Sequence, residues 1–556
     1  MRNAYAVSAA ESVVGDGFQW EIPEKFNIAQ DVCTRWADGS GRLALIDEDA
    51  DGKVRRFTFD ELDEMSNRLA NVLAAQGVSE GDRVAILLPQ CVECALVHLA
   101  SYKLGAVALP LFTLFGPEAL EHRLADSAAK LLVSDAVGIR KINALLAKLP
   151  GLKTLLSIDA TSGGEAQLFW PALHAASAGF SGPVTAAEDP ALLIYTSGTT
   201  GKSKGALHAH RVLLGHLPGV EMSHDGLPVD GDLFWTPADW AWIGGLLDVL
   251  LPAWHHGLPV LSHRFRKFDA ASAIDLMRRH RVRNVFLPPT ALKQIRERFR
   301  DAPPAGLALR SIASGGESLG DEIVGWVRHF FGVEINEFYG QTECNVVVSG
   351  SGSKFPRVSG AIGKATPGHA VFIVGADGTP LPAGSVGQIS VQGPDPVMFL
   401  SYWNLPEATR SKFIGDFLLT GDTGFMDGEG YVHFVGRDDD VITSAGYRIG
   451  PGPIEDCLIS HPLVSMAAVV GLPDPVRTER VTAFVVLKAD GVASPELAVE
   501  LQDRVRSQLA AHEYPRDVHF VNELPLTTTG KIIRAELRRS AMASAVKQEQ
   551  GKEIAG

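Results

Sequence analysis

Short apolar runs rich in β-branched residues alternate with amphipathic stretches over the first two thirds of the chain. The run at 83–89, RVAILLP, precedes a stretch at 91–104 with helical spacing of apolar residues that ends at Gly105. Comparable runs are GAVALPL (105–111), AKLLVSD (129–135), ALLIYTS (191–197), VRNVFLPP (282–289) and LRSIASGG (309–316). This alternation predicts an α/β fold with parallel sheets covered by helices on both faces. Ligands of such folds bind at the carboxyl ends of the strands.

The pattern changes after Gly363, where glycine and proline separate short strands, as in HAVFIVGADGTPLPAGSVGQISVQG. This texture predicts a small antiparallel β subdomain over about 363–436. The charged cluster GRDDD (436–440) then precedes a smaller αβ segment. A chain of 556 residues is too long for one core. We therefore expect an N-terminal domain over 1–436 and a small, mobile C-terminal α+β domain over 437–556.

The charge balance restricts the class of partner. The chain carries 51 basic and 65 acidic residues, a formal charge of −14, which argues against nucleic acid or an anionic membrane surface. The most hydrophobic window, 95–115, contains His98, Lys103, Gly105 and Pro110, so it predicts a helix, a turn and a strand and not a membrane span. The amino terminus has no apolar run of signal-peptide length, and we expect a cytoplasmic protein.

The five cysteines are few and odd in number, which fits a reduced compartment. Cys91 and Cys94 form a lone CxxC in a stretch with helical spacing of apolar residues. We interpret the pair as helix packing.

The stretch YTSGTTGKSKGALHAH (195–210) combines hydroxyl side chains, glycines and two lysines directly after a predicted strand. A P-loop of the NTPase type needs a glycine five residues before Gly201, and Thr196 occupies that position. Hydroxyls and free amides in a glycine-rich loop can still surround a triphosphate and release pyrophosphate. The alternative at this point is a mobile polar surface loop.

Three later stretches accompany this loop in order: EFYGQTEC (337–344), LLTGDTGFMDGEGYVHFVGRDDDVITSAGYRIGPGPIE (418–455) and PLTTTGKIIRAELR (525–538). Together the four resemble the signatures of the acyl-adenylate-forming superfamily, nearest to its medium-chain and acetyl-CoA synthetase-like branch. The resemblance covers about residues 25–540. It implies a two-step, AMP-forming ligase, in which a carboxylic acid and ATP give acyl-AMP and pyrophosphate, and coenzyme A then displaces AMP.

The resemblance also implies residue roles at the phosphates. Glu343 is similar to the family's Mg²⁺ ligand, and a lone carboxylate completed by phosphate oxygens and waters suits that ion. Without this context Glu343 is equally a solvated glutamate at a strand end. The implied phosphate-loop ligands are Thr196, Ser197, Gly198, Thr199, Thr200, Gly201, Lys202 and Lys204.

The nucleoside contacts follow in the same way. Tyr339 resembles the aromatic residue that stacks on adenine, Thr342 the residue at the α-phosphate, and Asp422 a ribose ligand, although Asp422 is also a common turn residue. The remaining implied nucleotide contacts are Gly316, Glu317, Ser318, Glu337, Phe338, Gly340, Gln341, Arg437 and Arg448.

The C-terminal segment carries the mobile chemistry that the resemblance implies. Lys531 is similar to the catalytic lysine that offsets charge at the α-phosphate, and it is a candidate for regulatory acetylation by a lysine acetyltransferase. Asp439 matches the hinge. Gly446, Tyr447 and Arg506 are candidate contacts for coenzyme A. The sequence leaves open whether the protein forms a homo-oligomer.

The candidate acyl pocket comprises Trp242, Ile243, Gly244, Gly315 and Gly340. Acetate- and propionate-specific members carry a tryptophan where this chain has Gly340. We expect the three glycines to leave volume, and hence an acid larger than propionate, medium-chain, branched or aryl. Trp235, Trp240 and Trp254 are interpreted as ordinary core residues.

The chain departs from the family pattern at a few positions. Thr478 replaces a usual glycine and Pro453 a usual glutamate, which puts details of the small domain in doubt. The other departures are Ser203, Cys344 and Gln388, and Cys344 is interpreted as a buried, inert thiol.

Rival functions remain at the level of sequence. They are an acetyl- or propionyl-CoA synthetase, an adenylation enzyme that loads a carrier protein, an oxygenase similar to luciferases, and a non-catalytic ATP-binding sensor. The joint presence of Lys531, Glu343 and Asp422 speaks against the sensor.

Overall fold

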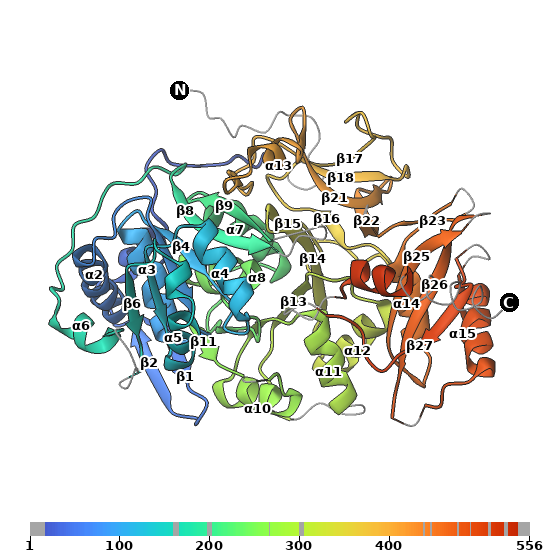
Figure 1. The fold of residues 1–556 in the computed structure, drawn as a ribbon, viewed down its shortest axis with the longest axis horizontal. Helices are drawn as coiled ribbons and strands as arrows, with labels where there is room; N and C mark the ends of the chain where they lie inside the picture. Colours follow the sequence, from blue (N-terminus) through green and yellow to red (C-terminus); the bar gives the residue numbers. More distant parts are fainter. Residues whose placement is uncertain are drawn as a thin grey trace.

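The computed structural model is organised around three β-sheets, two in the large N-terminal part and one in the C-terminal part (Figure 1). It describes residues 17–159, 166–196, 203–265, 267–299, 305–437, 440–444, 447–474, 477–489, 491–509, 513–526 and 532–542. The side chains of Thr443, Tyr447 and Arg448 lie outside the described part.

The first sheet is parallel at its centre and has the order β19-β9-β8-β4-β3-β5-β6-β7. Strands β9 and β19 join it antiparallel, so β8 and β9 form a hairpin whose connection is the glycine-rich loop. The bounds are β3 (Arg83–Leu87), β4 (Val107–Pro110), β5 (Leu131–Ser134), β6 (Thr154–Ser157), β7 (Gln167–Leu168), β8 (Pro190–Thr196), β9 (Lys204–Ala209) and β19 (Ser401–Tyr402).

The second sheet has the order β17-β18-β21-β22-β16-β15-β14-β13-β12-β10-β11-β1-β2, with β20 paired to β21. Its pairs from β11 through β10, β12 and β13 to β14 are parallel. The bounds in this part are β1 (Leu43–Glu48), β2 (Val54–Thr58), β10 (Phe234–Trp235), β11 (Val260–His263), β12 (Asn284–Phe286), β13 (Ser311–Gly315) and β14 (Ile335–Gln341).

From β15 onward the second sheet is antiparallel, as the glycine- and proline-rich texture predicts. The change of direction occurs at the β14–β15 hairpin, before Gly363, and the antiparallel strands continue the same sheet. The bounds are β15 (Cys344–Ser349), β16 (Gly363–Ala365), β17 (Val371–Val374), β18 (Gly387–Gln392), β20 (Phe413–Ile414), β21 (Phe417–Met426) and β22 (Tyr431–Arg437).

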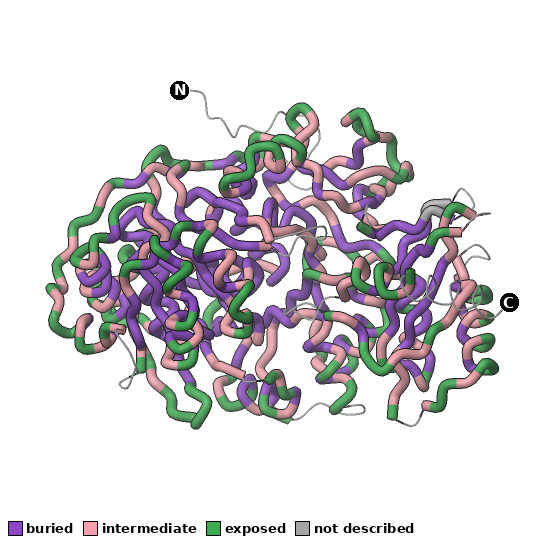
Figure 2. Tube along the Cα trace, in the orientation of Figure 1, coloured by how far each residue is buried: buried purple, intermediate pink, exposed green. Residues whose placement is uncertain are grey.

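Helices cover both faces of the parallel sheets, which confirms the α/β prediction. Apolar side chains of α2, α3, α7 and α9 form one core between the first two sheets, α4 and α5 cover the outer face of the first sheet, and α10, α11 and α12 cover the second (Figures 1 and 2). The bounds are α1 (Ile28–Val32), α2 (Phe59–Ala75), α3 (Val92–Lys103), α4 (Pro117–Asp126), α5 (Ala136–Asn143), α6 (Phe169–Ala175), α7 (Val212–Ser223), α8 (Ile243–Gly245), α9 (Leu251–His255), α10 (Ala270–His280), α11 (Pro289–Arg298), α12 (Asp321–Phe331) and α13 (Pro406–Arg410), with the 3-10 turns η1 (Thr34–Trp36) and η2 (Leu146–Lys148) and the π-helical turn η3 (Leu246–Leu250).

The C-terminal part is an α+β unit whose sheet has the order β24-β23-β26-β25, with β27 beside β26. Helices α14 and α15 pack their apolar side chains against this sheet. The bounds are β23 (Ile442–Ser444), β24 (Tyr447–Ile449), α14 (Pro451–Ile459), β25 (Val464–Asp474), β26 (Thr478–Leu487), α15 (Pro495–Gln508) and β27 (Asp517–Phe520).

The structure confirms several predictions about packing. Cys91 caps α3 and Cys94 lies within it, and burial raises the pKa of both thiols well above the usual value. Trp235, Trp240 and Trp254 are fully buried core residues. Within the described ranges, no helix combines the length and the apolar character that crossing a membrane requires.

Candidate active site

The β14–β15 hairpin places the proposed metal ligand. Strand β14 continues the parallel sheet, and a short turn of Thr342 and Glu343 reverses the chain, so that Gln341 pairs with Cys344. Glu343 is only 6% exposed, and its backbone carbonyl accepts a hydrogen bond from the amide of Phe399 at 2.9 Å. The hairpin therefore fixes this carboxylate at the carboxyl end of β14, where α/β sheets bind ligands.

Tyr402, which the sequence did not single out, holds the Glu343 side chain. Its hydroxyl donates a hydrogen bond to Oε1 of Glu343, and the ring lies beneath the Lys204 ammonium, with Nζ 5.2 Å from the ring centroid. Burial next to the Glu343 carboxylate raises the pKa of the Tyr402 hydroxyl, so the phenol keeps the proton that it donates. Tyr402 belongs to the stretch LSYWNLPE, which lies between the recognised motifs and carries no signal of its own.

The two ends of the phosphate loop face each other across the β8–β9 hairpin. Thr196 ends β8 and pairs with Lys204, which begins β9, and the Thr196 hydroxyl lies 3.4 Å from the Lys204 carbonyl oxygen. The predicted ligands between them, Ser197, Gly198, Thr199, Thr200, Gly201 and Lys202, lie outside the described residues. The structure thus brings the two anchors of this loop together with Glu343.

The proposed nucleoside residues converge at the start of the antiparallel part. The Tyr339 hydroxyl donates a hydrogen bond to Oδ2 of Asp422 at 2.6 Å, and the β21–β22 register places Asp422 opposite Arg437. Burial and the Asp422 carboxylate together raise the pKa of Tyr339. The two predicted ribose contacts and the predicted stacking residue therefore form one cluster, although they are separated by about 80 residues in the chain.

Lys412 is a second residue that the sequence analysis missed. Its ammonium donates to Oε1 of Gln341 at 2.8 Å and to the carbonyls of Leu419 and Thr420 at 3.0 and 3.1 Å. The Gln341 amide in turn donates to Thr420 at 2.8 Å. Lys412 therefore joins β14 to β21, the strand that carries the proposed ribose ligand Asp422. Lys412 precedes Asp422 by ten residues in the sequence.

The side chains of Glu337 and Phe338 serve hydrogen bonding and core packing and not direct nucleotide contact. Glu337 Oε1 accepts a hydrogen bond from the Leu319 amide at 3.0 Å, so it holds the loop that follows Gly316, Glu317 and Ser318. Burial raises the pKa of Glu337 to about 8. The Phe338 ring packs in the core, 5.3 Å from that of Phe286.

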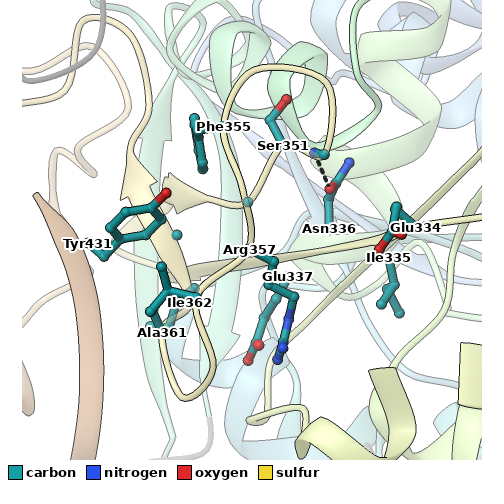
Figure 3. A pocket seen from close by; sticks show the side chains of 14 residues that line it. Glu334, Ile335, Asn336, Glu337, Ser351, Phe355, Arg357, Ala361, Ile362 and Tyr431 are labelled. Atoms are coloured by element: carbon teal, nitrogen blue, oxygen red, sulfur yellow. Dashed lines mark hydrogen bonds between the residues drawn. The ribbon is translucent and has the colours of Figure 1, made fainter. Parts of the chain in front are cut away.

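A recess of about 380 Å³, including the space open to solvent, lies beside β14 (Figure 3). Glu337 and Arg357 lie side by side in it, and Tyr431 closes one end. Tyr339, Asp422 and Glu343 do not line it. We therefore assign the recess to the outer side of this strand and not to the candidate active site.

The acyl-pocket argument from glycines needs correction. A Cβ at Gly340 would lie 2.4 Å from the Val346 amide nitrogen, and one at Gly315 would lie 2.6 Å from the Phe338 ring. At Gly244 the Trp242 and Phe286 rings already occupy the space, at 3.0 and 3.1 Å. These glycines permit close packing of backbone and aromatic rings, and the expected empty volume at their side-chain positions is absent. Ile243, the remaining predicted residue, is 3% exposed.

The C-terminal part carries a group of arginines around Tyr514. The Arg516 guanidinium lies 3.7 Å and that of Arg506 lies 5.7 Å from the centroid of this ring. Burial and the positive charges of Arg477 and Arg506 lower the pKa of Arg516. The predicted contact Arg506 is therefore part of a cationic cluster that fits a phosphate group.

Several predicted residues of the C-terminal segment lie outside the described part of the chain. These predictions concern Lys531, Asp439 and Gly446, together with the side chains of Tyr447 and Arg448, whose backbone forms β24. Arg534, three residues after Lys531, donates to both oxygens of Glu455 at 3.1 and 2.6 Å and to Asp440 at 3.4 Å.

The departures from the family pattern have local explanations. Thr478 has φ +72°, the left-handed conformation that favours the usual glycine. Cys344 is fully buried, and this burial raises the pKa of its thiol, in agreement with an inert role. Pro453 is accommodated in the first turn of α14.

Comparison with known proteins identifies the family of the chain. The model of the family described as AMP-binding enzyme matches residues 33–403, and that of the AMP-binding enzyme C-terminal domain matches residues 453–531. The chain belongs to the AMP-binding enzyme family. The predicted AMP-forming acid–thiol ligase is thereby confirmed at the level of the family, with ATP and coenzyme A as its co-substrates.

Individual relatives cover almost the whole chain. The mitochondrial acyl-coenzyme A synthetase ACSM4 of Homo sapiens is 34% identical over 93% of this chain and 91% of its own length. An uncharacterized acyl-CoA ligase, YtcI of Bacillus subtilis (strain 168), is 33% identical over 93% and 96%. Among solved structures, the anthranilate CoA ligase AuaEII in complex with anthranoyl-AMP has a TM-score of 0.85 at 28% identity and covers 94% of this chain and 99% of that one.

Proposed function

We propose that this ligase activates a carboxylic acid larger than propionate, medium-chain, branched or aryl, through an acyl-adenylate. The observation that carries the proposal is the double contact of Tyr402, which binds the Glu343 carboxylate and packs beneath Lys204. This contact places the candidate metal ligand beside the anchor of the phosphate loop. A lone carboxylate next to a triphosphate loop is what the first half-reaction requires.

The donor set at Glu343 fits magnesium. No group of three or more histidine, cysteine, aspartate or glutamate residues that could enclose a metal occurs in the described part of the chain. Mg²⁺ commonly binds through one or two carboxylates and completes its shell with phosphate oxygens and water. Bound at Glu343, it would neutralise charge on the departing pyrophosphate.

Other residues of the chain bind the nucleoside and coenzyme A and stabilise charge at the α-phosphate. Tyr339, Asp422 and Arg437 hold the nucleoside, and Thr342 lies at the turn where the α-phosphate would be bound. Lys531 stabilises the charge that develops when the acid's carboxylate attacks this phosphate. The Arg506–Arg516 cluster receives a phosphate of coenzyme A for the second half-reaction.

The glycine positions, Gly340 included, provide no empty volume of their own, so the preference for a large acid is proposed from the structural neighbours. Trp242 packs obliquely against Phe286, with centroids 5.5 Å apart, and we infer that it forms an apolar wall for an aryl or extended alkyl group. The anthranilate CoA ligase among the structural neighbours supports an aryl acid.

The experiment is AMP formation with acetate, butyrate, isobutyrate, octanoate and benzoate, each with and without coenzyme A. We expect octanoate or benzoate to exceed acetate at least tenfold in kcat/KM, since each buried methylene contributes about 0.8 kcal/mol. Equal use of acetate would favour the acetyl-CoA synthetase alternative. Turnover that requires an added carrier protein in place of coenzyme A would favour the carrier-loading alternative, and no AMP with any acid would refute the proposal.

A further inference from the structure

We propose that Tyr402 is a positioning residue that orients the Glu343 carboxylate for the metal–nucleotide complex. The inference rests on the proposed role of Glu343 as the metal ligand.

The hydrogen bond itself restricts the carboxylate. Tyr402 and Glu343 are 5% and 6% exposed, and the phenol donates to Oε1 only, which leaves Oε2 for a metal ion. In the described residues no second side chain hydrogen-bonds to Glu343, so the hydroxyl of Tyr402 alone selects the rotamer. Carboxylates that bind metals commonly need such a hydrogen-bonded partner, whose loss weakens metal affinity or activity 10–100-fold.

Strand pairing links Tyr402 to the phosphate loop. Strand β19 pairs antiparallel with β9, which places Tyr402 opposite Ala206. The bonds from Trp403 N to Gly205 O and from Leu400 N to Leu207 O, both 2.7 Å, fasten the residues on either side of β19 to the same strand. Because β9 begins at Lys204, the strand pairing fixes Tyr402 relative to Lys204 as well as to Glu343.

The same segment also contacts the hairpin turn through its backbone. Phe399, three residues before Tyr402, donates its amide to the Glu343 carbonyl at 2.9 Å, and its ring contacts that of Tyr402 at 4.9 Å. Segment 399–403 therefore bridges the two sheets at the point where their candidate ligands meet. The ring supplies packing and the hydroxyl supplies orientation, and a substitution can separate the two.

The test is Tyr402→Phe, which keeps the ring against Phe399 and Lys204 and removes only the hydroxyl. Mn²⁺ serves as a spectroscopic probe: its binding in the presence of the non-cleavable α,β-methylene analogue of ATP is measured by electron paramagnetic resonance. We expect at least a tenfold weaker Mn²⁺ affinity, while binding of AMP, which needs no metal, changes less than twofold.

The matched control is Tyr431→Phe, which also removes a buried tyrosine hydroxyl, the one that donates to the Pro356 carbonyl at 2.7 Å outside the candidate active site. We expect its Mn²⁺ affinity to equal that of the wild type. The Glu343→Gln variant and the double variant Glu343→Gln/Tyr402→Phe should bind Mn²⁺ equally weakly, because the hydroxyl acts only through the carboxylate.

Two outcomes would overturn the inference. Unchanged Mn²⁺ affinity in Tyr402→Phe would remove the orienting role, and an equal loss of AMP binding would assign the residue to general structure. Neither readout requires turnover. A failure of the acid panel would therefore contradict the proposed function while leaving the binding result for Tyr402 to be judged separately.

Discussion

At the scale of one residue, Gly340 shows how the lack of a side chain allows tight packing in the β14–β15 hairpin. Its Cβ position is blocked by the backbone of the β14–β15 hairpin, whose turn carries Glu343. The absence of a side chain at Gly340 therefore mainly allows the close approach of the two strands of the hairpin, and its effect on the size of the acyl pocket is secondary.

Substituting Gly340→Ala should consequently reduce stability and rate together and leave the ratio between acids unchanged. The added methyl group must displace the Val346 amide, at a cost of roughly 1–3 kcal/mol in the free energy of unfolding, and it shifts Glu343. Urea denaturation and AMP formation measure the two effects. Gly325→Ala in α12 is the control, because nothing lies within 4 Å of its Cβ position and alanine should raise stability by about 0.5–1 kcal/mol. An altered acid preference in Gly340→Ala at unchanged stability would contradict this interpretation.

How much the sequence predicts differs between residues of one site. Tyr339, Asp422, Arg437 and Glu343 lie in motifs with fixed spacing, and the structure brings the first three together as expected. Tyr402 and Lys412 lie outside the recognised motifs. Their roles depend on the pairing of β19 with β9 and on contacts across the sheet, which no local pattern encodes.

At the scale of elements, the C-terminal part fixes the residues on either side of the segment that carries the predicted catalytic lysine. Residues 527–531 are preceded and followed by Leu526 and Ile532, which form an antiparallel bridge. Arg534 then anchors the chain to Glu455 in α14 and to Asp440, next to the predicted hinge. The arginine and the glutamate are 19% and 10% exposed, so this is a largely buried ion pair.

Substituting Arg534→Met should leave Glu455 without its counter-charge and destabilise the small domain by roughly 3 kcal/mol. We also expect acyl-AMP formation to fall more than the conversion of supplied acyl-AMP and coenzyme A to thioester, because the loop with Lys531 loses its anchor. The two half-reactions are assayed separately, with the exposed Arg539→Met as control. Equal losses in both half-reactions would show that the anchor does not serve Lys531 specifically.

The elements of the parallel sheets were predictable because each apolar run had the length and composition of a buried strand. Strands β3, β4, β5, β12 and β13 all fall within the predicted runs, and β8 begins one residue before its run. The direction of β9 was not predictable, since an antiparallel return after β8 depends on the loop between them. The antiparallel strands β15–β18 and β20–β22 likewise extend an existing sheet, which composition alone does not reveal.

At the scale of the whole molecule, a group of buried neutral histidines links stability to pH. Burial lowers the pKa of His98, His208, His210 and His224 to about 3 and that of His216 to about 4. The unfolded chain has histidine pKa values near 6.5. Below that pH the unfolded state binds more protons than the folded state. Each histidine's contribution to the free energy of unfolding is therefore present above about pH 6.5 and is lost as the pH falls towards 4.

Buried carboxyl groups with a raised pKa act in the opposite sense, and Glu337 and Asp239 are two of them. Burial raises the pKa of Glu337 to about 8 and that of Asp239 to about 6, so in the folded state they bind protons that the unfolded state has released. Their contribution to the free energy of unfolding grows as the pH falls from 8 to about 4. The net slope of stability against pH is therefore the difference between the histidine and carboxyl contributions, and a single-residue substitution is needed to isolate either.

His208→Leu should flatten the loss of stability between pH 7.5 and pH 5. His208 is completely buried, and in the described structure neither ring nitrogen has a hydrogen-bond partner. Each such histidine lowers the free energy of unfolding by up to about 1.4 kcal/mol per pH unit below its unfolded pKa. Urea midpoints at the two pH values measure the change, with the exposed His174→Leu as control. Equal pH slopes in wild type and His208→Leu would refute the assignment.

The sequence by itself determined the strand and helix content, the family and the order of the motifs, because apolar spacing and motif spacing are local properties of the chain. The tertiary structure alone decided which side chains meet. The bond from Tyr402 to Glu343 and the Lys412 bridge to β14 join segments that are about 60 to 70 residues apart in the sequence, and the closed space at Gly340 arises from the tight β14–β15 hairpin. Such contacts depend on strand register and hairpin direction, which are set by the packing of the whole core.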